Sequence, residues 1–129
     1  MIKSRFLLDT SAIIYLTTRG NVIPSSLENE LDDADLFISI ISEIELFSKP
    51  DLPLDEKENL RVFLSERICI IDLTSAVKNE TIVLRCDTKH KLPDCIIAAT
   101  AIVLDAVLLT ADKKLLNLSG AGLKTQFIF

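Results

Sequence analysis

The sequence predicts an α/β domain in which helices cover both faces of a central, mainly parallel sheet of four to five strands, giving three layers. Two features favour this fold. Segments typical of strands alternate with segments typical of helices along the 129 residues. The strand segments are apolar throughout, which is typical of strands buried on both faces of a parallel sheet. We therefore expect one domain, spanning residues 1–129.

The expected strands are short apolar runs that end at turns or at residues suited to capping a helix. They comprise residues 4–9, 36–40, 68–72, 106–110 and 124–129. In a parallel sheet all carboxyl ends lie at one edge, where ligands of open α/β folds bind. Polar residues that directly follow a strand are therefore candidates for a functional site.

The expected helices differ in how far they are buried. They comprise residues 12–17, a short helix from residue 25, then 41–47, 54–67, 75–89, 92–104 and a short helix around 115–116, with a turn at 119–122. The segment from Cys95 to Leu104 is apolar at every position except Thr100, and a helix that is apolar on all sides is buried. Pro93 suits the first turn of this helix.

The composition indicates a cytoplasmic protein with partners. Hydrophobic residues make up 49% of the chain, which predicts an apolar surface covered by a second copy or another protein. Three cysteines without CxxC spacing, Cys69, Cys86 and Cys95, predict buried thiols in a reducing compartment. No signal peptide is expected, and Asp105 interrupts the most apolar stretch before it is long enough for a membrane span.

Several acidic residues fall at strand ends or helix starts on the same edge of the predicted sheet. Asp9 follows the first strand, Asp112 follows the fourth, and Asp94 lies in the first turn of the apolar helix. The helix after the second strand offers Glu43 or Glu45. Carboxylates that converge without basic partners repel one another, and this repulsion raises their pKa values.

All of these acids except Asp112 also have a purely structural interpretation. Asp9 and Asp94 are favoured as a helix cap and a first-turn acid. Ser42 and Glu45 have the spacing of a capping box, and Glu43 would be an ordinary solvated side chain. If the acids converge instead, a divalent cation resolves their repulsion. Oxygen ligands suit Mg²⁺ or Mn²⁺, and no His-Cys cluster favours zinc.

Four segments of the chain resemble the motif blocks of the PIN-domain ribonucleases. They are residues 7–11, 38–46, 92–101 and 109–112, and their order and spacing are most similar to VapC-type toxins of toxin-antitoxin pairs. The resemblance implies that the acid of the second block is Glu45. It also implies that Ser11 and Thr110 line the metal site or hold its acids.

The resemblance further implies a metal-dependent endoribonuclease. One or two Mg²⁺ or Mn²⁺ ions held by Asp9, Glu45, Asp94 and Asp112 would activate water for in-line attack on RNA, leaving a 5′-phosphate and a 3′-hydroxyl. The implied partners are a small antitoxin and a second copy of the chain. We expect the antitoxin in an apolar groove formed by the helices that start at residues 25 and 41, with Phe47 as an anchor; the alternative is that this apolar face is part of the core.

The net charge of −5 argues at first against a nucleic-acid ligand, but removing the four site acids from −5 leaves −1. Lysines flank the predicted site on both sides: Lys89 and Lys91 precede the apolar helix, and Lys113 follows Asp112. They are candidates for contacts with RNA phosphates, with solvated surface as the alternative. His90 is expected to be a surface residue.

Two other functions fit parts of the sequence. A phospho-acceptor receiver domain would use Asp72 as its acceptor, with Thr110 and Lys113 in support, but it leaves Asp94 without a purpose. A catalytically inactive PIN-fold binding module would keep the fold without turnover. Metal titration separates this module from the enzyme, because only the enzyme should be stabilised by Mg²⁺ or Mn²⁺.

Overall fold

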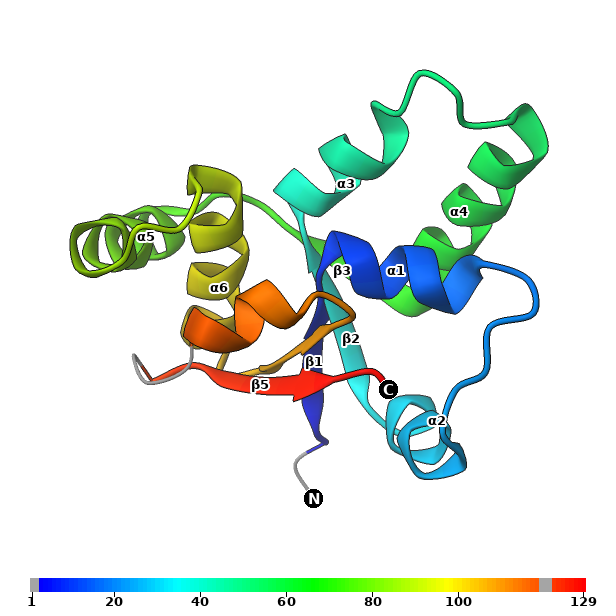
Figure 1. The fold of residues 1–129 in the computed structure, drawn as a ribbon, viewed down its shortest axis with the longest axis horizontal. Helices are drawn as coiled ribbons and strands as arrows, with labels where there is room; N and C mark the ends of the chain where they lie inside the picture. Colours follow the sequence, from blue (N-terminus) through cyan, green and yellow to red (C-terminus); the bar gives the residue numbers. More distant parts are fainter. Residues whose placement is uncertain (1–2, 119–121) are drawn as a thin grey trace.

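A computed structural model of the protein describes residues 3–118 and 122–129. Five strands form one sheet in the order β3-β2-β1-β4-β5, and every neighbouring pair is parallel (Figure 1). The strands are β1 (Arg5–Leu8), β2 (Asp35–Ser39), β3 (Ile68–Ile71), β4 (Val107–Thr110) and β5 (Lys124–Phe127). The predicted parallel sheet is confirmed.

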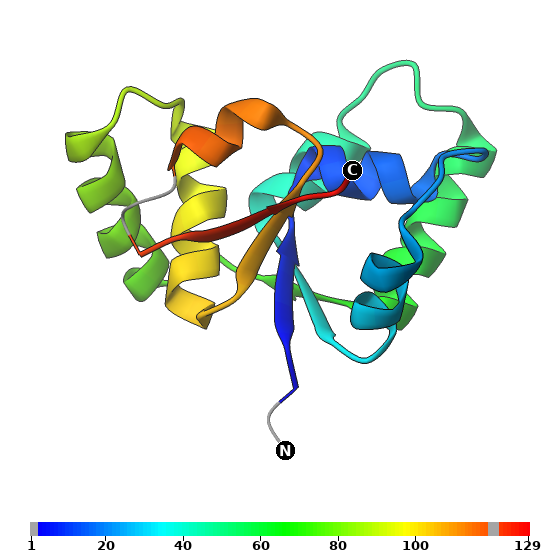
Figure 2. The same ribbon diagram turned by 60° about the horizontal axis from the view of Figure 1, so that its bottom comes forward.

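Helices cover both faces of this sheet and complete three layers. They are α1 (Thr10–Thr17), α2 (Ser25–Asp32), α3 (Ile40–Phe47), α4 (Leu54–Arg67), α5 (Ser75–Asp87), α6 (Leu92–Leu104) and the 3-10 helix η1 (Lys113–Leu118). The pair α5 and α6 lies on one side of the strands, and α1, α2 and α4 lie on the other (Figure 2). Within the described residues, no helix is long and apolar enough to cross a membrane.

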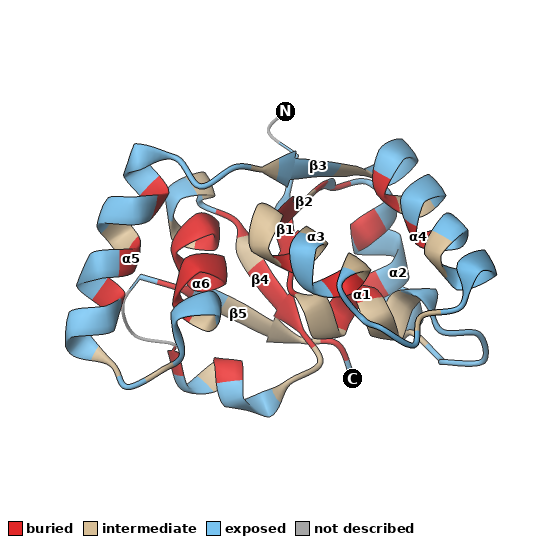
Figure 3. Cartoon of the chain, turned by 90° about the horizontal axis from the view of Figure 1, so that it is seen from above, coloured by how far each residue is buried: buried red, intermediate tan, exposed pale blue. Residues whose placement is uncertain are grey.

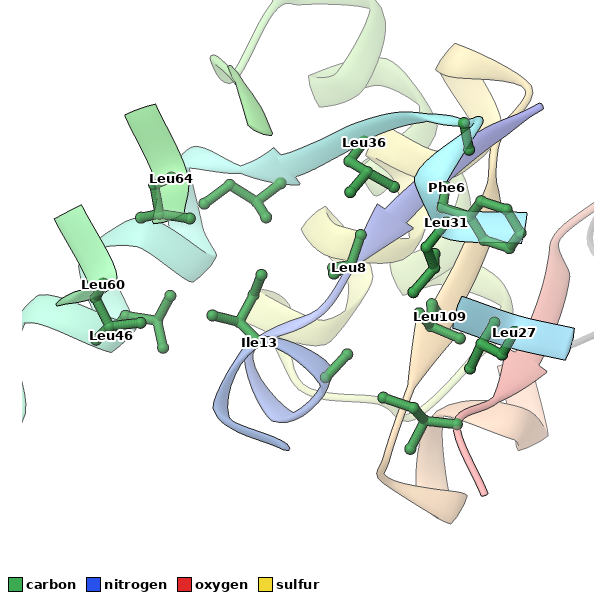
Figure 4. Close-up of a cluster of buried hydrophobic side chains, with 14 residues drawn as sticks. Phe6, Leu8, Ile13, Leu27, Leu31, Leu36, Leu46, Leu60, Leu64 and Leu109 are labelled. Atoms are coloured by element: carbon green, nitrogen blue, oxygen red, sulfur yellow. The ribbon is translucent and has the colours of Figure 1, made fainter. Parts of the chain in front are cut away.

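Strand β1 shows why the strands are apolar on both sides. Successive side chains of a strand point to opposite faces of the sheet. Phe6 and Leu8 belong to a buried cluster with residues of α1, α2 and α4, including Ile13 (Figure 4). Leu7 belongs to a second cluster, formed mainly with α5 and α6. The continuous apolar run of β1 therefore supplies a core on each side of this central strand.

Helix α6 is the most deeply buried helix, as its composition predicts. Every residue from Cys95 to Ala101 is buried (Figure 3). Pro93 lies in the first turn, where the missing N–H leaves no hydrogen bond unmade. The last turn departs from the prediction, because Val103 is exposed.

Some predicted boundaries were wrong by a few residues. Helix α3 begins earlier than expected: Ser39 is its cap, and the Ser39 hydroxyl accepts a hydrogen bond from the Ile41 amide at 3.1 Å. Ser42 is therefore buried inside the helix and cannot start a capping box. Helix α5 and strand β5 both end two residues early, at Asp87 and Phe127. Most of the turn predicted at 119–122 lies outside the described residues.

The prediction of three buried thiols was wrong for two cysteines. Cys95 is buried in α6, but Cys69 and Cys86 are exposed. Cys69 lies on β3, which is an edge strand of the sheet and pairs only with β2. Cys86 lies on the solvent side of α5. An apolar run does not reveal whether its strand is central or at an edge.

The predicted groove between the helices starting at residues 25 and 41 was also wrong. Leu27 and Leu31 of α2 are buried in the core, so they are not available to a partner. Phe47 of α3 is half-buried, and the guanidinium of Arg61 lies 5.7 Å from its ring centroid. The apolar faces of these helices hold the domain together.

The chain connectivity gives the sheet a topological switch point at its centre. From β1 the chain continues to β2 on one side, and after β3 it returns to β4 on the other side of β1. The carboxyl ends of β1 and β4 lie next to each other, and the Asp9 amide donates to the Leu109 carbonyl at 3.1 Å. Ligands of open α/β sheets bind at such a switch point. We call this place the crevice: it comprises the turns after β1 and β4 and the neighbouring parts of α3 and α6.

We expect Leu7→Ala to lower the free energy of unfolding by about 2–5 kcal/mol, because Leu7 is fully buried and its truncation leaves a cavity. Leu54→Ala makes the same change at a side chain that is 82% exposed, and its effect should stay within about 0.5 kcal/mol. Urea unfolding followed by circular dichroism measures both. Equal losses in the two variants would contradict this description of the core.

Candidate active site

Asp9 is a buried carboxylate held by three donors. It is 2% exposed and caps α1. Its Oδ1 accepts hydrogen bonds from the Ala12 amide at 2.7 Å and from the Ser11 hydroxyl at 2.7 Å. Its Oδ2 accepts a hydrogen bond from the Thr110 hydroxyl. Asp9 thus does cap its helix, and it lies in the crevice at the same time.

Ser11 and Thr110 connect the two turns that form the crevice. The Ser11 hydroxyl oxygen accepts a hydrogen bond from the Ala111 amide at 3.0 Å. The Thr110 hydroxyl oxygen accepts one from the Asp112 amide at 2.9 Å. The turn after β1 and the turn after β4 are therefore fixed to each other by two hydroxyl groups, which also hold Asp9.

Asp112 lies at the start of the turn that leads into η1. Its Oδ1 accepts a hydrogen bond from the Lys114 amide at 3.0 Å, and the side chain is half-buried. Its negative charge acts on two other acids, because it helps to raise the pKa of both Asp9 and Asp94. Asp112 is therefore close enough to both carboxylates for its charge to act on them.

Glu45, and not Glu43, faces the crevice. The Thr10 hydroxyl donates a hydrogen bond to Glu45 Oε1 at 2.7 Å, which ties α3 to the first residue of α1. Glu43 instead lines a cavity together with Phe47 and Arg61. Thr10 was not identified from the sequence. Its position directly after Asp9 was the one feature of the sequence that pointed to it. That it binds Glu45 depends on how α3 packs against α1, which the sequence does not show.

Asp94 lies half-buried in the first turn of α6, next to other acids. Burial raises its pKa above the ordinary value of 3.8, and the charges of Glu45 and Asp112 raise it further. His90 and Lys91 oppose this shift more weakly. The structure thus brings Asp94 within electrostatic reach of the acids of α3 and of the turn after β4.

Burial also raises the pKa of Asp9 above 3.8, although the hydrogen bonds from Thr110, Ala12 and Ser11 partly offset this effect. None of the four acids has a salt-bridge partner in the part of the chain that the structure describes. The ion pairs found there join Arg61 to Glu58 and Lys124 to Asp105. The crevice therefore concentrates negative charge without a basic side chain to neutralise it.

The donor chemistry of the crevice fits a hard divalent cation. All of the candidate ligands are carboxylate oxygens, the type that Mg²⁺ and Mn²⁺ prefer. Over residues 3–118 and 122–129, no three acidic, imidazole or thiol groups already form a ligand cluster. Asp9 is fixed by its hydrogen bonds, whereas Glu45 is exposed and has room to change rotamer. Shared ligation would therefore need the more exposed acids to turn toward Asp9.

The candidate phosphate-binding lysines are all at the surface. Lys89, Lys91 and Lys113 are exposed. The ammonium of Lys113 lies 5.9 Å from the centroid of the Phe127 ring. His90 is half-buried, and its backbone carbonyl accepts a hydrogen bond from the Arg85 guanidinium at 2.6 Å.

The strand order argues against the receiver-domain alternative. Receiver domains of the flavodoxin-like type have the order 2-1-3-4-5, whereas this sheet has β3-β2-β1-β4-β5. Asp72 follows β3, and three strand spacings, roughly 14 Å, separate β3 from the strand that carries Thr110. These two residues therefore do not form one phospho-acceptor site.

Comparison with solved structures finds the same fold in toxin-antitoxin complexes. VapBC2 from Rickettsia felis bound to a promoter DNA fragment matches with a TM-score of 0.79 and 24% identity over 95% of this chain and 98% of that chain. DNA-bound VapBC from Salmonella typhimurium matches with a TM-score of 0.76 and 19% identity, covering 98% and 99%. VapBC-1 from nontypeable Haemophilus influenzae matches with a TM-score of 0.75 and 22% identity, covering 95% and 97%.

Comparison with curated protein sequences gives no match. The sequence model of the PIN domain family matches residues 6–121, which include all four motif segments. The resemblance stated from those segments is confirmed, and the chain belongs to the PIN domain family.

Proposed function

We propose that residues 1–129 form a metal-dependent endoribonuclease domain that hydrolyses RNA phosphodiester bonds. The observation that carries this proposal is the concentration of acids from four separate segments at the switch point of the sheet, with raised pKa values at Asp9 and Asp94. Membership of the PIN domain family supports it. A crevice that collects unpaired carboxylates is costly for folding, and binding a cation offsets this cost.

In this proposal Asp9, Glu45, Asp94 and Asp112 hold one or two Mg²⁺ or Mn²⁺ ions. The bound cation supplies Lewis-acid activation of water and charge stabilisation at the phosphate. The chain itself orients the ligands: Ser11 and Thr110 hold Asp9, and Thr10 holds Glu45. Hydroxyl donors of this kind fix a ligand's direction from outside the coordination sphere.

Binding of RNA in this proposal uses the lysines on both sides of the acids. Lys89 and Lys91 precede α6, and Lys113 follows the turn after β4, so positive side chains flank the crevice. Each such contact with a phosphate releases counterions from the RNA. Once the bound cations neutralise the acids, little net negative charge remains to repel the substrate.

We also propose that the protein is the toxin of a toxin-antitoxin pair in the cytoplasm and forms a homodimer. The three solved structures compared above are described as VapBC. A cavity of about 550 Å³ between α1, α3 and α4 would receive a segment of the antitoxin. Ile14, Leu46 and Leu60 line it, with Arg19 and Lys49 among its charged residues. The alternative is an inactive binding module, which would show no response to metal.

Of the predictions that test this proposal, the first concerns Asp94. We expect wild-type protein to cleave a mixed RNA pool with Mg²⁺ or Mn²⁺ and to be inactive in EDTA. Loss of a residue that supports a metal ligand from outside the coordination sphere typically lowers metal affinity or activity by about 10–100-fold. Asp94→Asn changes a proposed ligand itself and should lower the cleavage rate by more than that. Asp72→Asn is the matched control, because Asp72 also follows a strand but lies outside the crevice. Cleavage rates on a labelled RNA measure both.

Equal rates in wild type and Asp94→Asn would contradict the proposed metal site. If wild type is inert as well, and its Tm does not change on adding Mg²⁺ or Mn²⁺, the inactive binding module is the correct interpretation.

The second prediction concerns pH. Because the pKa values of Asp9 and Asp94 are raised in the folded state, the folded state binds these two protons more tightly than the unfolded state does. The bound protons therefore stabilise the fold below pH 3.8, and this contribution is lost as the pH rises through the raised pKa values. At neutral pH the ionised acids oppose folding, and a bound cation relieves this opposition. Mg²⁺ should therefore raise Tm more at about pH 7.5 than at about pH 5, where protons compete for the same oxygens. Thermal unfolding with Mg²⁺ or EDTA at each pH tests this, and a pH-independent shift would count against it.

The third prediction concerns Thr10. Thr10→Val removes the hydrogen bond to Glu45 while keeping the shape of the side chain. We expect the Mg²⁺ concentration for half-maximal cleavage to rise on the order of 10-fold, as for other groups that orient metal ligands. Thr10→Ser keeps the hydroxyl group and should show the same Mg²⁺ dependence as the wild type. Thr17→Val makes the same change at the other end of α1 and should leave the metal dependence unchanged. A Thr10→Val variant with wild-type metal dependence would show that Glu45 needs no such support.

A further inference from the structure

Three aromatic rings gather where β5 ends. The rings of Tyr15 and Phe129 meet edge to face with centroids 4.6 Å apart, and those of Phe127 and Phe129 are 5.0 Å apart. The Tyr15 hydroxyl donates to the Val22 carbonyl at 2.6 Å, which fixes its ring. Phe129 is 63% exposed, and it is the one aromatic residue among the exposed large hydrophobic side chains of the described residues.

This aromatic cluster lies one strand away from β4, which precedes Asp112, and two strands away from β1, which precedes Asp9. Phe127 pairs with Thr110 across β4 and β5, and the Ile128 amide donates to the Thr110 carbonyl at 2.9 Å. Thr110 in turn binds Asp9 through its hydroxyl. Neighbouring strands are about 4.8 Å apart, so the rings and the acids share one edge of the sheet. Figure 2 shows the end of β5 beside α1, on the side of the sheet opposite the amino terminus.

A positive charge accompanies the rings. The Lys113 ammonium lies 5.9 Å from the centroid of the Phe127 ring, close enough for a cation–π contact. Lys113 and the adjacent Lys114 are both exposed. Proteins that bind single-stranded nucleic acids combine aromatic rings for the bases with basic side chains for the phosphates.

We propose that Phe129, supported by Tyr15 and Phe127, stacks against a base of single-stranded RNA whose adjoining phosphate contacts Lys113. The positive charge beside the rings favours this ligand over an apolar protein segment. Bases of single-stranded RNA are available for stacking, whereas those of a duplex are already stacked. The inference rests on the proposed nuclease function and adds to it a subsite that holds substrate beside the acids.

The test measures binding separately from cleavage. All variants carry Asp94→Asn, and fluorescence anisotropy follows their binding to a labelled single-stranded RNA of mixed sequence. Phe129→Ala should raise Kd roughly 5- to 150-fold, the range that corresponds to loss of one stacked base. Phe129→Trp should bind like the parent, because it keeps an aromatic face. Phe129→Leu keeps apolar area without that face and should bind weakly.

Lys113 gives an independent readout. Lys113→Gln should make the slope of log Kd against log salt concentration shallower by about 0.7, the contribution of one phosphate contact on a single strand. Lys49→Gln is the control, because Lys49 lines the cavity between α1, α3 and α4 and is not part of the proposed subsite. An unchanged slope in Lys113→Gln would overturn its assigned contact.

The outcomes separate this inference from the proposed function. If wild type cleaves RNA with metal but Phe129→Ala and Phe129→Leu bind like the parent, the stacking subsite is wrong and the nuclease remains. If these variants instead alter the oligomeric state and leave RNA binding unchanged, the rings form a protein interface and the inference is overturned. If wild type neither binds nor cleaves RNA, the proposed function fails and the subsite fails with it.

Discussion

The hydrogen bond from the Thr110 hydroxyl to the Asp9 carboxylate links the two central strands at the point where both end. Asp9 is 2% exposed, and a carboxylate this deeply buried destabilises the fold unless its oxygens are hydrogen-bonded. Its three donors come from the strand β4 and from the start of α1. Satisfying one buried charge therefore fixes β1, β4 and α1 relative to one another, and it directs the turn that carries Asp112.

The burial of acids at the strand ends lowers the stability of the fold but suits a site that binds a ligand. Burial raises the pKa of Asp9 and Asp94, which means that the ionised acids are less stable in the fold than in water. The apolar clusters on the two faces of the sheet compensate for this cost. Their contacts with alternate residues of β1 hold this strand between two cores, and Asp9 follows directly where the strand ends. A rigid scaffold beneath a destabilising site is typical of sites that are prepared for a ligand.

The sequence predicted the sheet, its helices and the acids of the crevice because these depend on local patterns. Apolar runs mark the strands, Asp9 and Asp112 directly follow two of them, and Asp94 lies in the first turn of the apolar helix α6. The exposure of Cys69 depends instead on the order of the strands, which places β3 at an edge. The burial of Leu27 depends on how α2 packs on the sheet. Neither the strand order nor the packing of α2 can be predicted from the local sequence around Cys69 or Leu27.

The finer parts of the site depend on packing between distant segments. Glu43 and Glu45 are two residues apart, so they point in directions about 200° apart around α3, and only one of them faces α1. Likewise, Phe127 lies beside Thr110 only because β5 adds to the sheet next to β4. Asp9 and Asp112 follow β1 and β4, and Glu45 and Asp94 lie in α3 and α6. Of the aromatic residues, Phe127 ends β5 and Phe129 follows it. In the proposed arrangement, a substitution at Phe129 would therefore change base binding beside the acids and leave the proposed metal ligands in place, because none of these ligands lies on β5.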